Sequence, residues 1–187
     1  MLKQFYSSFS VFVIILILTM TFLAGCFSVK PGAIKSGKNL YESFYVGDQG
    51  TQYFIKPLKF ENDKNGYVFL VDFTFQYKDD LSEIVTVNFS LISDTKPDQP
   101  DSLIIKSKGN RIAGRDIKSL YRQKKSQDFV FRYTTEAKLE NLHKLMESNQ
   151  WQVKIYNARQ NLKYSPKRKT QKNIEKLYQN VFVLLVD

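Results

Sequence analysis

Apolar and polar residues alternate along two neighbouring stretches of the chain, residues 66–77 and 83–92. In each stretch every second side chain is aromatic or aliphatic, and many of those between are polar, which is the pattern of a strand with one buried face. The turn-forming sequence KDDLS separates the two stretches, so they are predicted to pair as an antiparallel hairpin. A further strand is predicted over residues 52–60, where Pro57 requires a sheet edge or a bulge.

In the second half of the chain, segments with the two-residue period of strands are mixed with segments that have the 3.6-residue period of helices. Short strands are predicted at residues 103–106, 128–133 and 151–156, and helices at residues 114–123, at residues 139–149 and from about Thr170 onward. The last residues of the third helix fit a strand equally well. The apolar sides of the three helices consist of Ile117, Leu120 and Tyr121, then Leu139, Leu142 and Met146, then Ile174, Leu177, Tyr178, Val181 and Leu185.

This order of elements favours an α+β fold. Strands come first, helices and strands then alternate without a regular βαβ repeat, and such chains build an antiparallel sheet with two or three helices packed on one face. We predict a single domain over residues 41–187, because the length suits one hydrophobic core. Residues 26–40, with scattered Gly, Ser and Lys, are predicted to form a flexible tether before it.

The first 25 residues follow a different pattern. Lys3 is the one charge among the first ten residues, and residues 11–24 are apolar apart from two threonines. This run is shorter than the ~20 residues that cross a bilayer. A signal peptide over residues 1–25 is therefore the preferred interpretation, and an uncleaved anchor is the alternative.

The sequence Leu23-Ala24-Gly25-Cys26 ends this segment. Together with the apolar run and Lys3 it resembles the lipobox of bacterial lipoproteins, over residues 1–26 only. The resemblance implies cleavage between Gly25 and Cys26 and attachment of a diacylglycerol to the Cys26 sulfur. The lipid would hold the mature protein on a membrane of the cell envelope. Phe27 stands where an aspartate resembles an inner-membrane retention signal in some enteric bacteria, which favours the outer membrane.

The chain is strongly basic, with 28 Lys and Arg against 18 Asp and Glu and a formal net charge of +10. Such a charge favours anionic neighbours, such as lipid head groups or acidic glycans. An address outside the cytoplasm makes nucleic acid the poorest of these partners, so none is predicted. The densest basic segment, residues 163–172, is predicted to be a loop, either merely solvated or in contact with an anionic surface through Lys163, Lys167, Arg168, Lys169 and Lys172.

Candidate catalytic groups are few. His143 is the one histidine, and we expect it to be half-buried at the border of the apolar side of its helix. With Cys26 carrying lipid, no thiol is left for a disulfide, and no metal site or cofactor is predicted. We therefore expect a non-enzymatic binding or assembly module for a protein or glycan partner.

The alternative is a carboxylate-dependent hydrolase of envelope polymers, which needs two acids facing one bond. The acids available to it are Asp72, Asp79, Asp80 and Glu83. Asp79 and Asp80 suit a hairpin turn, where Asp is favoured. Asp72 lies on the polar side of its strand, where we expect it to be solvated.

Overall fold

The computed structural model describes residues 40–62, 64, 67–81, 83–158 and 161–185. The predicted signal peptide, the predicted cleavage and lipidation site at Gly25 and Cys26, and all of the predicted tether before Leu40 lie outside the described residues. No helix among the described residues is long and apolar enough to span a membrane.

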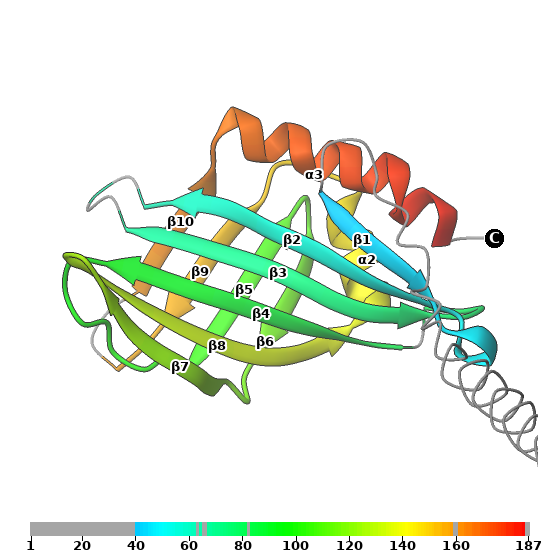
Figure 1. Ribbon diagram of the computed structural model, residues 1–187. Coiled ribbons are helices and arrows are strands. Elements are labelled where there is room, and N and C mark those ends of the chain that lie inside the picture. The colour runs from blue at the N-terminus through cyan, green and yellow to red at the C-terminus, as the bar shows by residue number, and fades with distance from the viewer. Residues whose placement is uncertain (1–39, 63, 65–66, 82, 159–160, 186–187) are drawn as a thin grey trace, which may run out of the picture. The chain divides into compact units, whose positions relative to one another are not determined.

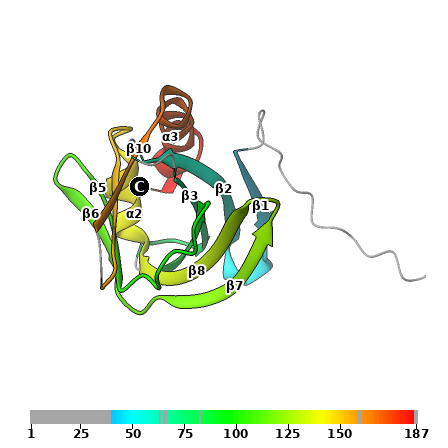
Figure 2. The ribbon, with the colours of Figure 1, turned by 90° about the vertical axis from the view of Figure 1, so that its left-hand side faces the viewer.

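Within the described residues, ten antiparallel strands form one sheet that curls around the core (Figures 1 and 2). Its order is β6-β5-β9-β10-β2-β3-β4-β8-β7, and β1 pairs with β2 beside this path. The strands are β1 (Tyr41–Tyr45), β2 (Thr51–Glu61), β3 (Val68–Tyr77), β4 (Ile84–Ser93), β5 (Ser102–Ser107), β6 (Asn110–Gly114), β7 (Lys118–Lys125), β8 (Asp128–Lys138), β9 (Gln152–Tyr156) and β10 (Asn161–Pro166). The prediction of an antiparallel sheet with helices is confirmed at the level of class, although strands dominate more than expected.

The predicted hairpin is the pair β3 and β4. Phe69, Val71 and Phe73 of β3 are fully buried, and each lies opposite a buried apolar residue of β4. The strand predicted around Pro57 is β2, and its register against β3 shifts between Ile55 and Leu58. The bulge that the proline requires is therefore present.

In the part of the chain that the structure describes, two α-helices, α2 (Leu139–Met146) and α3 (Arg168–Asn180), pack against the sheet, and there are two short 3₁₀ turns, η1 (Gly47–Gln49) and η2 (Phe182–Leu185). The N–H groups of Leu139 and Glu140 donate to the carbonyls of Glu83 and Leu81, so the β3–β4 turn satisfies the start of α2. The predicted half-buried His143 is more enclosed than expected, at 8% exposure. Its Nε2 lies 3.1 Å from the Phe182 carbonyl oxygen and ties α2 to η2.

The helix predicted at residues 114–123 is wrong. The chain forms β7 there, with all eight residues exposed, and Leu120 and Tyr121 are about half exposed rather than in the core. β7 ends the sheet and pairs with β8 alone. A helix here would have buried only three apolar residues. As a strand, β7 instead forms backbone hydrogen bonds with β8 along one of its sides. Its basic side chains suit the edge of a sheet.

The basic segment is not the predicted loop, since Lys163 lies in β10 and α3 already begins at Arg168. Cations in the first turn oppose the helix dipole by only a few tenths of a kcal/mol. Tertiary contacts outweigh this cost, because Thr170 donates through its hydroxyl to the Lys59 carbonyl at 2.7 Å and the helix buries Ile174 and Leu177.

The curl closes where the end of β6 meets β8. A Cβ added to Gly114 would lie 2.5 Å from Cγ2 of the buried Thr135, a distance that carbon atoms do not tolerate. Glycine at this position therefore allows the two strands to approach each other.

We predict that Gly114→Ala lowers the free energy of unfolding by about 1–3 kcal/mol, because the added methyl group overpacks this contact. Urea denaturation measures the loss. Combining it with Thr135→Ala, which removes the opposing methyl group, should recover part of the stability relative to the sum of the single changes. A Gly114→Ala protein that unfolds at the wild-type urea concentration contradicts the close contact.

Candidate anion-binding surface

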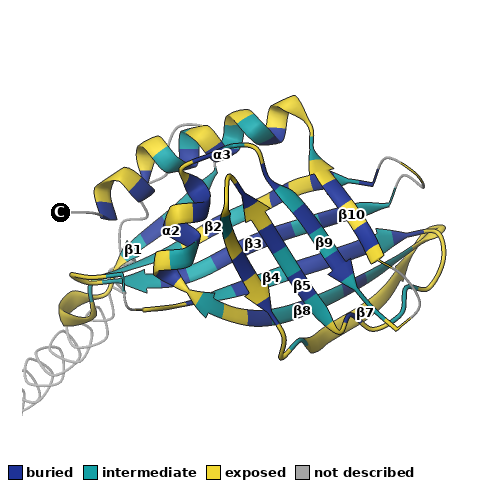
Figure 3. Cartoon of the chain, turned by 180° about the vertical axis from the view of Figure 1, so that it is seen from behind, coloured by how far each residue is buried: buried dark blue, intermediate teal, exposed yellow. Residues whose placement is uncertain are grey.

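Four strands, β6, β5, β9 and β10, turn one side to the core and the other to solvent. Their inward residues, such as Ile105, Ile112 and Val153, are fully buried, and the alternation is visible along the strands in Figure 3. We call the solvent side of these strands the basic face. It consists of Ser102, Ile104, Lys106, Arg111, Ala113, Gln152, Lys154, Tyr156, Asn161, Lys163 and Ser165.

Cations lie directly opposite one another on the basic face. Lys106 of β5 is the register partner of Arg111 of β6, and Lys154 of β9 is the partner of Lys163 of β10. Like charges in such positions destabilise a sheet. The ion pairs found in the described part of the chain involve other residues. The face itself contains no carboxylate, and Glu61, which lies opposite Ser165 on β2, pairs with Lys59 and Lys167.

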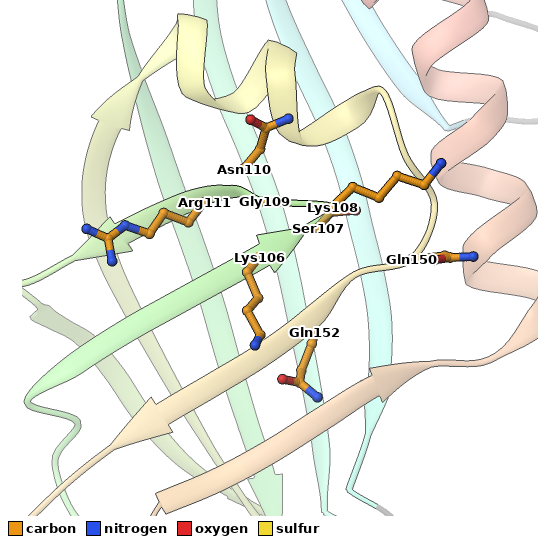
Figure 4. Close-up of a pocket in the computed structure, with 8 residues that line it drawn as sticks. All are labelled: Lys106, Ser107, Lys108, Gly109, Asn110, Arg111, Gln150 and Gln152. Atoms are coloured by element: carbon orange, nitrogen blue, oxygen red, sulfur yellow. The ribbon is translucent and has the colours of Figure 1, made fainter.

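A shallow hollow of about 420 Å³ lies at the end of the basic face, beside the β5–β6 turn (Figure 4). Lys108 and Gly109 form this turn with φ of 41° and 89°, as a two-residue type I′ hairpin requires. Lys106, Lys108 and Arg111 surround the hollow together with the amides of Gln150 and Gln152. Cations and amide groups therefore dominate its lining, so the hollow favours an anionic group of a larger partner.

The Asn110 side chain fixes this turn to α2. Its Nδ2 donates to the carbonyl oxygen of Lys144 at 2.9 Å, in the last turn of the helix. The hairpin that carries Lys106 and Arg111 is thereby held by a polar contact as well as by the strand pairing.

Of the five cations predicted to contact an anionic surface, Lys163 lies on the basic face. Arg168, Lys169 and Lys172 are exposed on the first turns of α3. Lys167, just before α3, pairs with Glu61, which also accepts from Lys59 at 2.9 Å. Hydrogen bonds, first from Lys167 and then from Lys59, lower the pKa of the Glu61 carboxyl group. The Lys167 ammonium group therefore already has a carboxylate partner.

The other cations of the basic face are not among the five predicted from the sequence. Lys106 and Lys154 occupy outward positions of two strands that were predicted from the sequence, so the alternation in these strands already indicated that both side chains face solvent. Arg111 lies in β6, a strand that the sequence did not indicate.

The candidate carboxylates do not converge. Asp72 lies in the middle of β3, whereas Asp79, Asp80 and Glu83 lie at its hairpin end, several strand residues away. The solvated position expected for Asp72 is wrong, since the residue is 8% exposed. Among the described residues no group of three or more His, Cys, Asp or Glu is placed to hold a metal ion.

Asp72 forms a two-pronged ion pair across the sheet. Arg132 Nη2 donates to both of its carboxylate oxygens, at 2.9 and 2.8 Å, and Arg132 Nη1 donates to the Ser90 hydroxyl at 3.3 Å. The three residues come from β3, β8 and β4, and Arg132 supplies the positive charge that makes the burial of Asp72 tolerable.

Comparison with known proteins gives no relative. No protein-family model matches the chain, no curated protein is similar to it at a significant level, and no solved structure has a matching fold at that level.

We predict that Asp72→Asn lowers the free energy of unfolding by about 2 kcal/mol, because Arg132 keeps its charge in a largely enclosed place without a counter-charge. Thermal or urea denaturation measures this loss. Glu140→Gln is the matched control, since it breaks the pair with Lys144, in which both side chains are about half exposed. Its effect should be much smaller, and equal losses for the two variants would refute the structural role of the Asp72–Arg132 pair.

Proposed function

We propose that this chain is a lipoprotein of the cell envelope, whose domain binds an anionic partner without catalysing a reaction. The observation that carries this proposal is the basic face, where two pairs of cations face each other and no carboxylate lies among the residues of the face. An anionic partner would supply the missing counter-charge. The partner is a protein or a glycan of the envelope.

The lipobox-like sequence supports the anchor. A diacylglycerol on Cys26, with or without a further acyl chain on the new amino terminus, would keep the protein on the outer membrane. Residues 26–40 separate this lipid from β1, and an extended chain of that length reaches about 50 Å. The domain can therefore meet a partner that lies away from the lipid surface.

The hydrolase alternative gains no support from the described carboxylates. Asp72 is held by Arg132, and the acids of the β3–β4 turn lie at a distance from it. Binding needs no catalytic residue and uses the cations that the fold brings together.

We predict that the mature protein begins at Cys26 and carries lipid on its sulfur. Mass spectrometry of protein extracted from cells should show the diacylglyceryl modification, and wild-type cells should incorporate labelled fatty acid into the protein. Cys26→Ser should abolish the label, because the serine hydroxyl cannot replace the thiol as the acylated group. An unmodified Cys26, or a leader still attached to the native protein, contradicts the anchor.

We also predict that the lipidated protein, extracted in a nonionic detergent, co-purifies with an envelope partner at low salt and loses it at high salt. Salt should release the partner because it screens exposed charges. A variant in which Lys106, Arg111, Lys154 and Lys163 are changed to Gln should keep its lipid and its fold but lose the partner. A protein that is always recovered alone, or a variant that retains the partner equally well, counts against the proposed function.

A further inference from the structure

The four cations of the basic face form one diagonal row. Arg111 and Lys106 lie side by side on β6 and β5, and Lys154 and Lys163 lie side by side on β9 and β10. Ile104 is the register partner of Lys154, so the second pair is displaced by two residues along the strands. Cβ atoms of residues directly opposite are about 5 Å apart and those of diagonal neighbours about 7–8 Å, so the Cβ atoms of the row span roughly 15 Å across the four strands.

We propose that this row binds a linear anionic polysaccharide laid across the four strands, with successive acidic groups of the polymer facing successive cations. The inference rests on the proposed function and specifies its partner. One sugar residue is about as long as the separation of neighbouring strands. A polymer with an acidic group on each sugar, such as a polyuronate, therefore presents acidic groups at intervals comparable to the spacing of the Cβ atoms along the row.

The directions of the side chains favour a row of charges over one compact anion. In Figure 4, Lys106 extends beside Gln152, whereas Arg111 extends away from both. The two cations are register partners, yet their charged ends lie apart, as repulsion between like charges would produce. A single small anion would contact one of them, whereas a polymer reaches both.

The groups around the row suit sugars. Gln152 and Asn161 offer amides, Ser102 and Ser165 offer hydroxyls, and all four share the basic face with the cations. Amides and hydroxyls both donate and accept hydrogen bonds, as the hydroxyls of a glycan require. Tyr156 adds a partly exposed ring at the end of β9, against which a sugar ring can pack.

A lipid surface fits the basic face less well. Docking on a bilayer combines cations with apolar side chains that enter the interface. The large hydrophobic residues that are exposed in the described part of the chain all lie outside this face. They are Tyr45, Val46, Phe54, Ile84, Leu120, Tyr121, Val183 and Leu184.

The test uses the full lipidated protein in nonionic detergent and measures binding by calorimetry. The probes are a hexamer of galacturonic acid, the galacturonate monomer at equal uronate concentration, and a neutral glucan hexamer. The hexamer of galacturonic acid should bind, more weakly as salt is added, and the other two should not bind measurably.

Two double variants with the same change in net charge locate the site. Lys106→Gln with Lys154→Gln should weaken binding of the acidic hexamer by about tenfold or more, as expected for the loss of two charge contacts. Lys124→Gln with Lys125→Gln removes two cations at the end of β7, neither of which belongs to the basic face, and should change the affinity by less than about twofold. Circular dichroism and melting temperature establish that both variants are folded.

The outcomes separate the inference from the proposed function. If the hexamer binds no better than the monomer, or if both double variants weaken it equally, the inference is overturned. If an acidic peptide of equal charge binds through Lys106 and Lys154 while the hexamer does not, the polysaccharide is overturned and the proposed protein or glycan partner survives. If only micelles doped with phosphatidylglycerol, or only an oligonucleotide of equal charge, bind through these residues, both are overturned. Binding of the hexamer that depends on Lys106 and Lys154 upholds both.

Discussion

The contacts of Trp151 hold together the two parts of the curled sheet. Strands β10 and β2 join these parts through only two register pairs, Ser165 with Glu61 and Pro166 with Phe60. Trp151, just before β9, stacks on Phe60 of β2 and meets Phe73 of β3 edge-on, with both ring centroids 6.1 Å away. Its indole N–H donates to the carbonyls of Leu145 and Ser148 at the end of α2. One buried side chain therefore fixes both parts of the sheet and a helix, through apolar contact and hydrogen bonds together.

This arrangement determines where the basic face can lie. Trp151 anchors the start of β9, and Val153 and Ile155 of β9 then fill the core. Lys154 between them must point to solvent, because neighbouring residues of a strand point to opposite sides. The same alternation directs Lys106 and Lys163 outward on the strands next to β9. The cations are thus brought together by a core that they do not enter.

The sequence predicted the elements in which apolar residues recur clearly at the spacing of a strand or of a helix. The hairpin of β3 and β4 was predicted because ten-residue strands with one fully aromatic or aliphatic side admit no other period. Strands β1, β6 and β10 were missed although β5 and β9, which are equally short, were predicted. β5 and β9 each have two aliphatic residues two positions apart, Leu103 and Ile105 or Val153 and Ile155, whereas β1, β6 and β10 have no such pair. β7 was mistaken for a helix, since Ile117, Leu120 and Tyr121 fit a helical spacing by accident and an exposed edge strand needs no alternation.

The candidate site was predictable only in part, for a related reason. Lys163 was identified from a run of cations along the chain, yet its partner on the face, Lys154, is nine residues away in sequence and directly opposite in the sheet. The burial of Asp72 likewise depends on Arg132, sixty residues further along. Which residues pair in this way depends on the register between strands, and the register cannot be read from the apolar and polar pattern of one strand alone.

The repulsion between the cations of the basic face destabilises the fold only slightly, yet its removal can increase the affinity for an anion. Each pair of like charges costs up to about 1 kcal/mol in a sheet, and water and salt around exposed side chains reduce this repulsion. The fully buried aromatic and aliphatic residues beneath the face contribute about 1.5–3 kcal/mol each, so the strands remain paired despite the repulsion. An anion that approaches the row removes this repulsion as well as adding its own attraction. The arrangement that slightly destabilises the free protein therefore increases its affinity for a partner whose charges follow the same line.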